Sequence, residues 1–174
     1  MFGNSHRSLA APDSLAHHVP MAKRYRPNVA AIIRRGDGCI LIARRSDYPE
    51  SWQFPQGGMD TDEHPEGALK REVAEEIALA PQSYRITAKR AGYRYDFPTG
   101  PDRRGFDGQE QTYFLCDLKK GAETGIAPHH GCGEFTEAAW VRPDNFPLDL
   151  VPPMKQSVYR RVLQDFFGVV PERH

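Results

Sequence analysis

Short apolar runs broken by glycine and proline turns make up the first part of the chain. Residues 29–33 and 39–43 are apolar and flank the turn Gly36-Asp37-Gly38. Two β-prone runs around such a turn predict a hairpin. Residues 52–58 (Trp-Gln-Phe-Pro-Gln-Gly-Gly) predict a further strand that runs into a glycine loop.

A helical pattern follows within residues 57–79. Leu69, Val73 and Ile77 recur at helical spacing and predict one face that packs on a core. Pro65 suits the first turn of this helix, because its missing N–H would have no partner there. We expect the helix to end at Ala80-Pro81.

The second half of the chain alternates strands and loops. The pattern predicts strands at residues 84–90, 92–95, 109–116 and 134–141, with loops at residues 98–108 and 121–133. The order of strands and helices predicts an α/β fold, in which helices cover a mixed sheet.

A second helix is predicted at residues 154–167. Val158, Val162 and Phe166 recur every four residues, and Gly168 is a suitable end for the helix. Tyr159 falls within this pattern, and we expect it in the core rather than at a ligand.

Length and charge indicate one domain without a general affinity for nucleic acid. The chain has 174 residues, which fits a single domain, and we assign residues 24–170 to it. Residues 1–23 show no periodicity and predict a flexible tail, in which Met21 is an alternative start. Lys plus Arg equals Asp plus Glu, at 23 each, so the net charge does not favour a general nucleic-acid binder.

The cysteines and the hydropathy pattern bear on location. Cys39, Cys116 and Cys132 are odd in number and far apart, which favours a reducing cytoplasm over a disulfide framework. No apolar run approaches the roughly 18 residues that would span a membrane. Residues 129–132 (His-His-Gly-Cys) contain ligand types for zinc but lack a second half, so we favour a polar loop.

Three carboxylates on the first predicted helix indicate a metal site. Glu72, Glu75 and Glu76 lie three and four positions apart and therefore share one helix face. Like charges within one turn repel, and a divalent cation would offset that repulsion. Hard oxygen ligands suit Mg²⁺ or Mn²⁺. The alternative is a solvated acidic face, which the wider spacing of the stretch disfavours.

That spacing resembles the signature of the Nudix hydrolases. From Gly57 the chain has five residues, Glu63, seven residues, and then Arg-Glu-Val-Ala-Glu-Glu-Ile-Ala-Leu at residues 71–79. The family has glycine where this chain has Ala78, at a helix end that favours positive φ, and a non-glycine residue there costs about 1–2 kcal/mol. The resemblance implies a Nudix α/β/α sandwich, in which the motif helix lies against a mixed sheet.

Further stretches resemble one branch of this family, the bacterial RNA pyrophosphohydrolases, which overlap in sequence with dinucleoside polyphosphate hydrolases. The resemblance covers residues 24–168 and rests on residues 25–29, 43–45, 52–58, 108–111 and 158–162. Met154 is a departure, because that branch has an aromatic residue there that packs on a base. Methionine still offers an apolar contact but loses aromatic stacking.

Carried over by position, the resemblance implies the residues of an active site. The implied metal ligands are Glu72, Glu75, Glu76 and Glu134. Arg71 and Glu63 would hold these carboxylates ionised and in place. The implied substrate contacts are Arg26, Arg44, Gly57, Gly58, Met154 and Lys155. Glu134 also has an ordinary reading as a loop acid, and the sequence does not identify which glutamate is the base.

The resemblance implies metal-assisted hydrolysis of a phosphoanhydride bond, with Mg²⁺ or Mn²⁺ as cofactor. We favour a 5′-triphosphate RNA end as substrate, converted to a monophosphate end. The alternative is a dinucleoside polyphosphate such as diadenosine tetraphosphate. A third hypothesis, from another class, is a catalytically inactive Nudix domain that binds a nucleotide. The sequence leaves open the base preference, the oligomeric state and any accessory activator.

Overall fold

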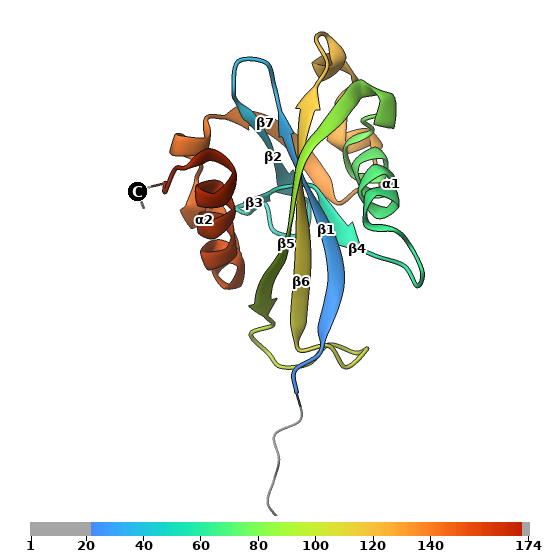
Figure 1. Ribbon diagram of the computed structural model, residues 1–174, viewed down its shortest axis with the longest axis vertical. Coiled ribbons are helices and arrows are strands. Elements are labelled where there is room, and N and C mark those ends of the chain that lie inside the picture. The colour runs from blue at the N-terminus through green and yellow to red at the C-terminus, as the bar shows by residue number, and fades with distance from the viewer. Residues whose placement is uncertain (1–21, 172–174) are drawn as a thin grey trace, which may run out of the picture.

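The computed structural model describes residues 22–171 of the chain (Figure 1). Residues 1–21 of the predicted tail, with the alternative start at Met21, lie outside the described residues. The strands are β1 (Tyr25–Arg34), β2 (Ile40–Arg45), β3 (Trp52–Gln53), β4 (Gln56–Gly58), β5 (Tyr84–Asp96), β6 (Gly108–Leu118) and β7 (Phe135–Val141). The α-helices are α1 (Pro65–Ile77) and α2 (Pro153–Phe167).

One mixed sheet joins these strands. The main path runs β3-β2-β1-β6-β5, with β4 paired to β1 and β7 paired to β2. The central strands β1 and β6 are parallel, while the other strand pairs of this sheet are antiparallel. The α/β class and the mixed sheet predicted from the sequence are therefore confirmed.

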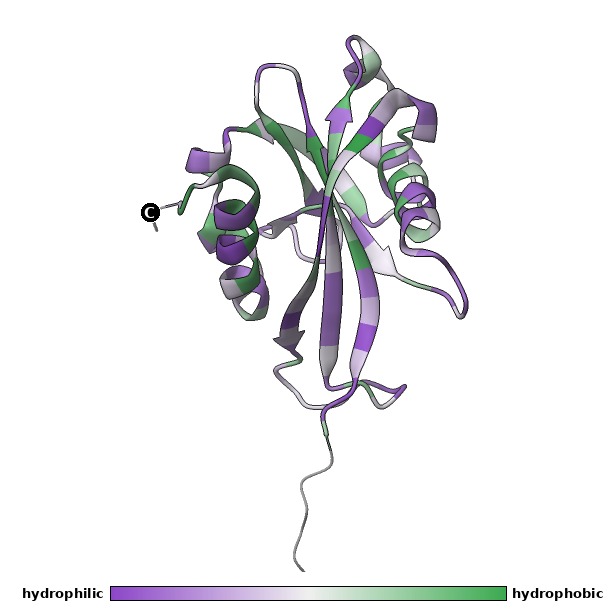
Figure 2. Ribbon diagram, viewed as in Figure 1, coloured by the Kyte–Doolittle hydropathy of each residue, from purple (hydrophilic) through white to green (hydrophobic). Residues whose placement is uncertain are grey.

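The alternation of residues along β1 separates two hydrophobic cores. Ala30 and Ile32 face the core that contains α2, and Ala31 and Ile33 face the core that contains α1. The two helices accordingly lie on opposite sides of the sheet (Figure 1). Both helices carry interleaved hydrophobic and hydrophilic residues along their length (Figure 2), as one-sided packing requires.

The apolar face predicted for α1 is confirmed, but the predicted end of the helix was wrong. Leu69, Val73 and Ile77 are fully buried or nearly so. The helix ends at Ile77 rather than at Ala80-Pro81, because Ala78 takes a left-handed conformation with φ 58°. A left-handed residue at this position stops a helix whether or not it is glycine.

Two strands expected in the middle of the chain are one. Residues 84–90 and 92–95 both belong to β5, and the pairing with β6 shifts register between Arg90 and Tyr93. Gly92 lies inside this irregularity with φ 84°, which explains why the sequence pattern is interrupted there.

The predicted second helix is confirmed. Val158, Val162 and Leu163 are buried against the sheet. Gly168 ends the helix in a left-handed conformation, with φ 69°, and its N–H donates to the Gln164 carbonyl at 2.9 Å.

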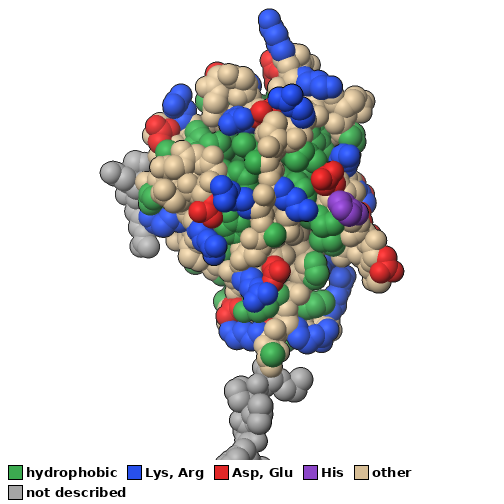
Figure 3. Space-filling model, viewed as in Figure 1, with side chains coloured by type: hydrophobic (Ala, Val, Ile, Leu, Met, Phe, Trp, Pro, Cys, Tyr) green, Lys and Arg blue, Asp and Glu red, His purple; other side chains and the backbone are tan. Residues whose placement is uncertain are grey.

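Surface properties agree with the neutral composition. On the face shown in Figure 3, Lys and Arg side chains are spread among neutral and hydrophobic ones rather than collected in one patch. No helix within residues 22–171 is long and apolar enough to cross a membrane. A cytoplasmic location stays a prediction.

Ala78→Gly should stabilise the protein, because glycine takes the left-handed conformation without the steric cost that alanine carries. The gain should be about 0.5–1 kcal/mol after the larger unfolded-state entropy of glycine is subtracted. Urea unfolding measures it. Ala80→Gly is the matched control, since Ala80 has an ordinary φ of −66°, and this change should lower stability. A lower free energy of unfolding for Ala78→Gly would contradict the argument.

Candidate active site

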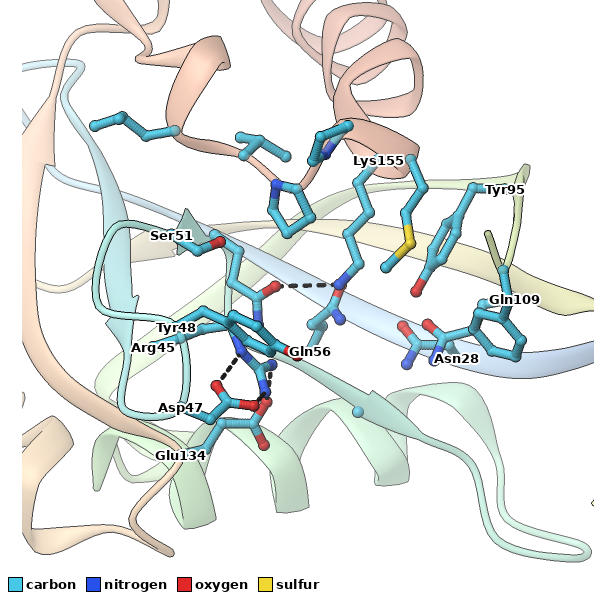
Figure 4. A pocket seen from close by; sticks show the side chains of 18 of the residues that line it. Asn28, Arg45, Asp47, Tyr48, Ser51, Gln56, Tyr95, Gln109, Glu134 and Lys155 are labelled. Atoms are coloured by element: carbon cyan, nitrogen blue, oxygen red, sulfur yellow. Dashed lines mark hydrogen bonds and ion pairs between the residues drawn. The ribbon is translucent and has the colours of Figure 1, made fainter. Parts of the chain in front are cut away.

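A cavity of about 900 Å³ lies where the motif helix, the sheet and the start of α2 come together. Side chains from β1, from the loop between β2 and β3, from β4 and from α1 line it, and α2 contributes Met154 and Lys155 (Figure 4). Of the predicted site residues, the lining includes Arg26, Gly57, Gly58, Glu72, Glu134, Met154 and Lys155.

Arg71 holds two of the motif carboxylates. Its Nε and Nη2 donate to the two oxygens of Glu63 at 3.0 and 2.8 Å, and its Nη1 donates to Glu72 Oε1 at 2.7 Å. Nη2 also donates to the Gly58 carbonyl at 3.0 Å. The hydrogen bonds from Arg71 lower the pKa of Glu63 to about 2, so Glu63 stays ionised as the partner that fixes the guanidinium.

Glu76 is a buried carboxylate with one unsatisfied oxygen. Its residue is 1% exposed, and Oε2 accepts the Gln56 N–H at 2.8 Å. Oε1 has no hydrogen-bond partner in the part of the chain that the structure describes. Burial, followed by the charges of Glu134 and Glu72, raises the pKa of Glu76 to about 10. A carboxylate in this state lacks a positive partner.

We call Glu72, Glu75, Glu76 and Glu134 together the acidic wall. The acidic wall fits a divalent cation. Glu72, Glu76 and Glu134 supply hard oxygen donors, and a cation beside Glu76 Oε1 would provide the missing partner and offset the repulsion. Within residues 22–171, no three such donors are already grouped as a metal would require. Glu75 instead accepts from Arg71 Nη1 at 3.4 Å, and its side chain is half-exposed.

The structure places Arg45, not Arg44, at the cavity. Arg45 Nη1 donates to Glu134 Oε1 at 2.8 Å. Arg44 lies outside the lining, where it pairs with Glu137 at 2.7 Å and packs on the Trp52 ring. The pairing of β2 with β7 shifts register between the two arginines, and such a bulge re-aims the side chains beside it. The sequence carries no signal for this bulge.

The loop before Glu134 packs against the end of α1. The Cys132 N–H donates to the Glu75 carbonyl at 2.7 Å. A Cβ on Gly131 would lie 2.3 Å from that same carbonyl oxygen, so only glycine allows this approach. The stretch considered for zinc, residues 129–132, thus closes the helix terminus and sets the position of Glu134, and it forms no metal cluster within the described residues.

Gly57 and Gly58 lie in strand β4 rather than in the predicted glycine loop, and they allow charged groups to approach the backbone. A Cβ on Gly57 would lie 1.9 Å from Glu72 Cδ, and a Cβ on Gly58 would lie 1.9 Å from Arg26 Nη2. The structure therefore brings the predicted residues Gly57, Gly58 and Arg26 together.

Lys155 is a buried cation opposite the carboxylates. It is 5% exposed, and its Nζ donates to Gln53 Oε1 at 3.1 Å. Burial and the nearby Arg45 charge lower the pKa of Lys155 to about 8. Its neighbour Met154 is 36% exposed at the mouth of the cavity. An ammonium group in this position suits an anion such as phosphate.

A buried amide network at the cavity floor was missed by sequence reasoning. Gln111 Nε2 donates to Asn28 Oδ1 at 3.0 Å and to Gln56 Oε1 at 2.7 Å, and the Tyr113 hydroxyl donates to Gln111 Oε1 at 2.9 Å. The glutamines of residues 108–111 at the start of a buried strand were the available signal. Tyr159 is fully buried, as predicted, and its hydroxyl accepts the Phe54 N–H at 3.0 Å.

Comparison with known families decides the assignment. The model of the NUDIX domain matches residues 24–166, which is most of the chain. This chain belongs to the Nudix family. As a Nudix hydrolase it is an enzyme that acts on pyrophosphate bonds, and the hypothesis of an inactive binding domain is not supported.

Curated relatives cover most of this Nudix hydrolase. A protein of Aeromonas hydrophila named RNA pyrophosphohydrolase is 40% identical over 148 residues, which is 82% of this chain and 83% of the relative. A Helicobacter pylori protein of the same name is 40% identical over 151 residues, which is 83% of this chain and 94% of the relative.

Solved structures confirm the Nudix fold. The Caenorhabditis elegans Ap4A hydrolase superposes with a TM-score of 0.62 at 18% identity, covering 82% of this chain and 98% of that one. The Escherichia coli dihydroneopterin triphosphate pyrophosphohydrolase gives a TM-score of 0.59 at 17% identity, covering 83% and 97%.

Gly57→Ala should impair catalysis while the fold is retained. The added methyl meets the end of the Glu72 side chain rather than backbone, so the carboxylate moves and the chain does not. We expect kcat/KM to fall at least about tenfold, since small displacements at such sites are costly, with a free energy of unfolding within about 1 kcal/mol of the parent. Gly36→Ala, with open space around it, is the control. Full activity of Gly57→Ala would contradict the placement of Glu72.

Glu76→Gln should abolish turnover and stabilise the metal-free protein. Burial raises the pKa of folded Glu76 to about 10, whereas the carboxyl has its ordinary pKa of 4.5 in the unfolded chain. Between these values the unfolded state binds fewer protons, so this group lowers stability as pH rises. Glutamine has no such proton, and it should raise the unfolding free energy at neutral pH on the order of 1–3 kcal/mol.

Chemical denaturation with a chelator present, from pH 5 to 9, measures this difference. The exposed Glu75→Gln is the comparison and should change stability little. Identical pH profiles for the parent and Glu76→Gln, or full activity of Glu76→Gln with Mg²⁺, would show that Glu76 does not have this role.

Proposed function

We propose that this Nudix hydrolase converts 5′-triphosphate RNA ends to monophosphate ends. The observation that carries the proposal is a cavity that joins carboxylates to the buried Lys155 and the half-buried Arg26 and Arg45, with exposed apolar side chains at its mouth. Its relatives named RNA pyrophosphohydrolase match over more than four fifths of the chain, which supports the same substrate class here.

Three cationic side chains supply the phosphate contacts in this proposal. Arg26, Arg45 and Lys155 line the cavity, and their side chains come from β1, β2 and α2. Guanidinium groups bind phosphate oxygens through paired N–H donors, and a buried ammonium adds a point charge. Together they would orient a triphosphate with its bridging oxygens toward the acidic wall.

The acidic wall is where the bond breaks in this proposal. Glu72, Glu75, Glu76 and Glu134 would hold Mg²⁺ or Mn²⁺, which supplies Lewis-acid stabilisation of the phosphate oxygens when bound. Arg71 keeps Glu63 and Glu72 in place through its hydrogen bonds. The buried amides of Gln53 and Gln56 form part of the cavity lining beside this wall.

A dinucleoside polyphosphate is the second candidate. Met154, at the mouth, provides an apolar contact without an aromatic face, which weakens base stacking on RNA at that position. Hydrolysis of a phosphoanhydride bond in a dinucleoside polyphosphate needs the same phosphate contacts. The acidic wall therefore does not show which of the two substrates the enzyme uses.

A side-by-side assay with Mg²⁺ tests the proposal. We expect 5′-triphosphorylated RNA to give a kcat/KM at least about tenfold above that of diadenosine tetraphosphate, a difference of roughly 1.4 kcal/mol in transition-state binding. Glu76→Gln is the matched control for contaminating hydrolases. A preference for the dinucleotide would replace the RNA proposal with the second candidate.

A further inference from the structure

Exposed hydrophobic side chains gather at the mouth of the cavity. Within residues 22–171 the large hydrophobic side chains that are exposed are Tyr48, Leu150, Met154 and Val170. Three of these four line the same cavity, and Val170 does not. Single exposed hydrophobic residues need no explanation, but a group at one ligand site indicates an apolar contact with the ligand.

Tyr48 is the most exposed of this group and the only aromatic one. Its exposed fraction is 67%, against 40% for Leu150 and 36% for Met154. In the part of the chain that the structure describes, the ring has no hydrogen bond and no aromatic contact. A planar ligand in the cavity would cover the apolar faces of this ring.

The backbone that carries Tyr48 is nevertheless well fixed. Its carbonyl accepts the Ser51 N–H at 2.8 Å, and Arg45 donates to both oxygens of Asp47 at 2.6 Å. The Ser46 N–H donates to the Glu134 carbonyl at 2.9 Å, which ties the loop to the acidic wall. An aromatic side chain on a fixed loop loses little entropy when it binds a planar group.

The other aromatic residues of the lining are already engaged. Tyr95 is 6% exposed, with Lys155 Nζ 5.5 Å from its ring centroid. Phe97 packs edge-on to Tyr95 at 6.1 Å. Tyr48 is therefore the aromatic ring that remains open to a ligand, as Figure 4 shows it on the loop beside Arg45.

We propose that Tyr48 stacks on a nucleobase of the substrate whose phosphates occupy the cavity. The inference rests on the proposed function, since it needs a nucleotide with several phosphates, but it does not depend on the choice between RNA and a dinucleotide. Stacking is tolerant of base identity, because every base has a π face. Tyr48 would thus strengthen binding without selecting one base.

The test compares Tyr48→Ala and Tyr48→Phe with the parent enzyme in Mg²⁺. We use short 5′-triphosphorylated RNA, the same RNA with abasic residues at its first two positions, and diadenosine tetraphosphate. Tyr48→Ala should raise KM about tenfold for the substrates with bases, with kcat within about twofold. Tyr48→Phe should behave like the parent, and the abasic RNA should show no difference between the variants. Val170→Ala is the matched control for an exposed hydrophobic residue away from the cavity.

Three results would overturn the proposal. The first is an unchanged KM in Tyr48→Ala. The second is an equal rise in the KM of Tyr48→Ala on abasic RNA, which would mean that Tyr48 only holds the loop. The third is an equal rise in KM in Tyr48→Phe, which would assign the role to the hydroxyl group. If the parent prefers the dinucleotide, the RNA assignment fails, while the KM change on diadenosine tetraphosphate still decides whether Tyr48 stacks. Circular dichroism of each variant confirms that the fold is kept.

Discussion

Burial of the Glu76 carboxylate is the constraint on which the rest of the site depends. Within residues 22–171 only one of its oxygens has a partner, the Gln56 N–H, and two neighbouring acids, Glu134 and Glu72, raise its pKa further. A buried group of this kind is costly unless a positive partner is present. The apolar face of α1, with Leu69 and Val73 packed against the sheet, offsets that cost and keeps the carboxylate in place. A divalent cation beside Glu76 Oε1 would supply that partner.

Arginine side chains preserve this arrangement by bridging carboxylates rather than pairing with one. Arg71 joins Glu63 to Glu72, and Arg45 joins Asp47 to Glu134. Each arginine connects segments that are distant in sequence or separated by a loop. These charge-assisted hydrogen bonds offset the repulsion between the carboxylates of the acidic wall. The glycine-rich strand β4 completes the arrangement, because side chains there would occupy the space that the charged groups use.

How far the sequence alone leads depends on the range of the interactions involved. The helix faces of α1 and α2, the hairpin and the carboxylate cluster follow from periodicity and spacing over a few residues. The choice of Arg45 over Arg44 follows from a bulge against β7, a strand about 90 residues later, and no local pattern encodes it. The continuity of β5 across Gly92 was missed for a similar reason, since it depends on pairing with the later strand β6. The end of α1 follows from the left-handed conformation of Ala78, whereas the sequence pattern placed the end at Ala80-Pro81.

The first turn of α2 contributes both to the proposed phosphate site and to the mouth of the cavity. Lys155 and Met154 are adjacent in sequence, and neighbours on a helix point in different directions. The Lys155 side chain is therefore buried in the cavity beside the proposed phosphate contacts, while the Met154 side chain is exposed at the mouth. The chemistry of the acidic wall is shared by any nucleotide with a chain of phosphates, so the wall alone does not select a substrate. In the proposed complex, selection would fall to the mouth, where the loop of residues 46–51 faces the start of α2 and where exposed apolar side chains lie beside the acidic Glu50 and Asp149.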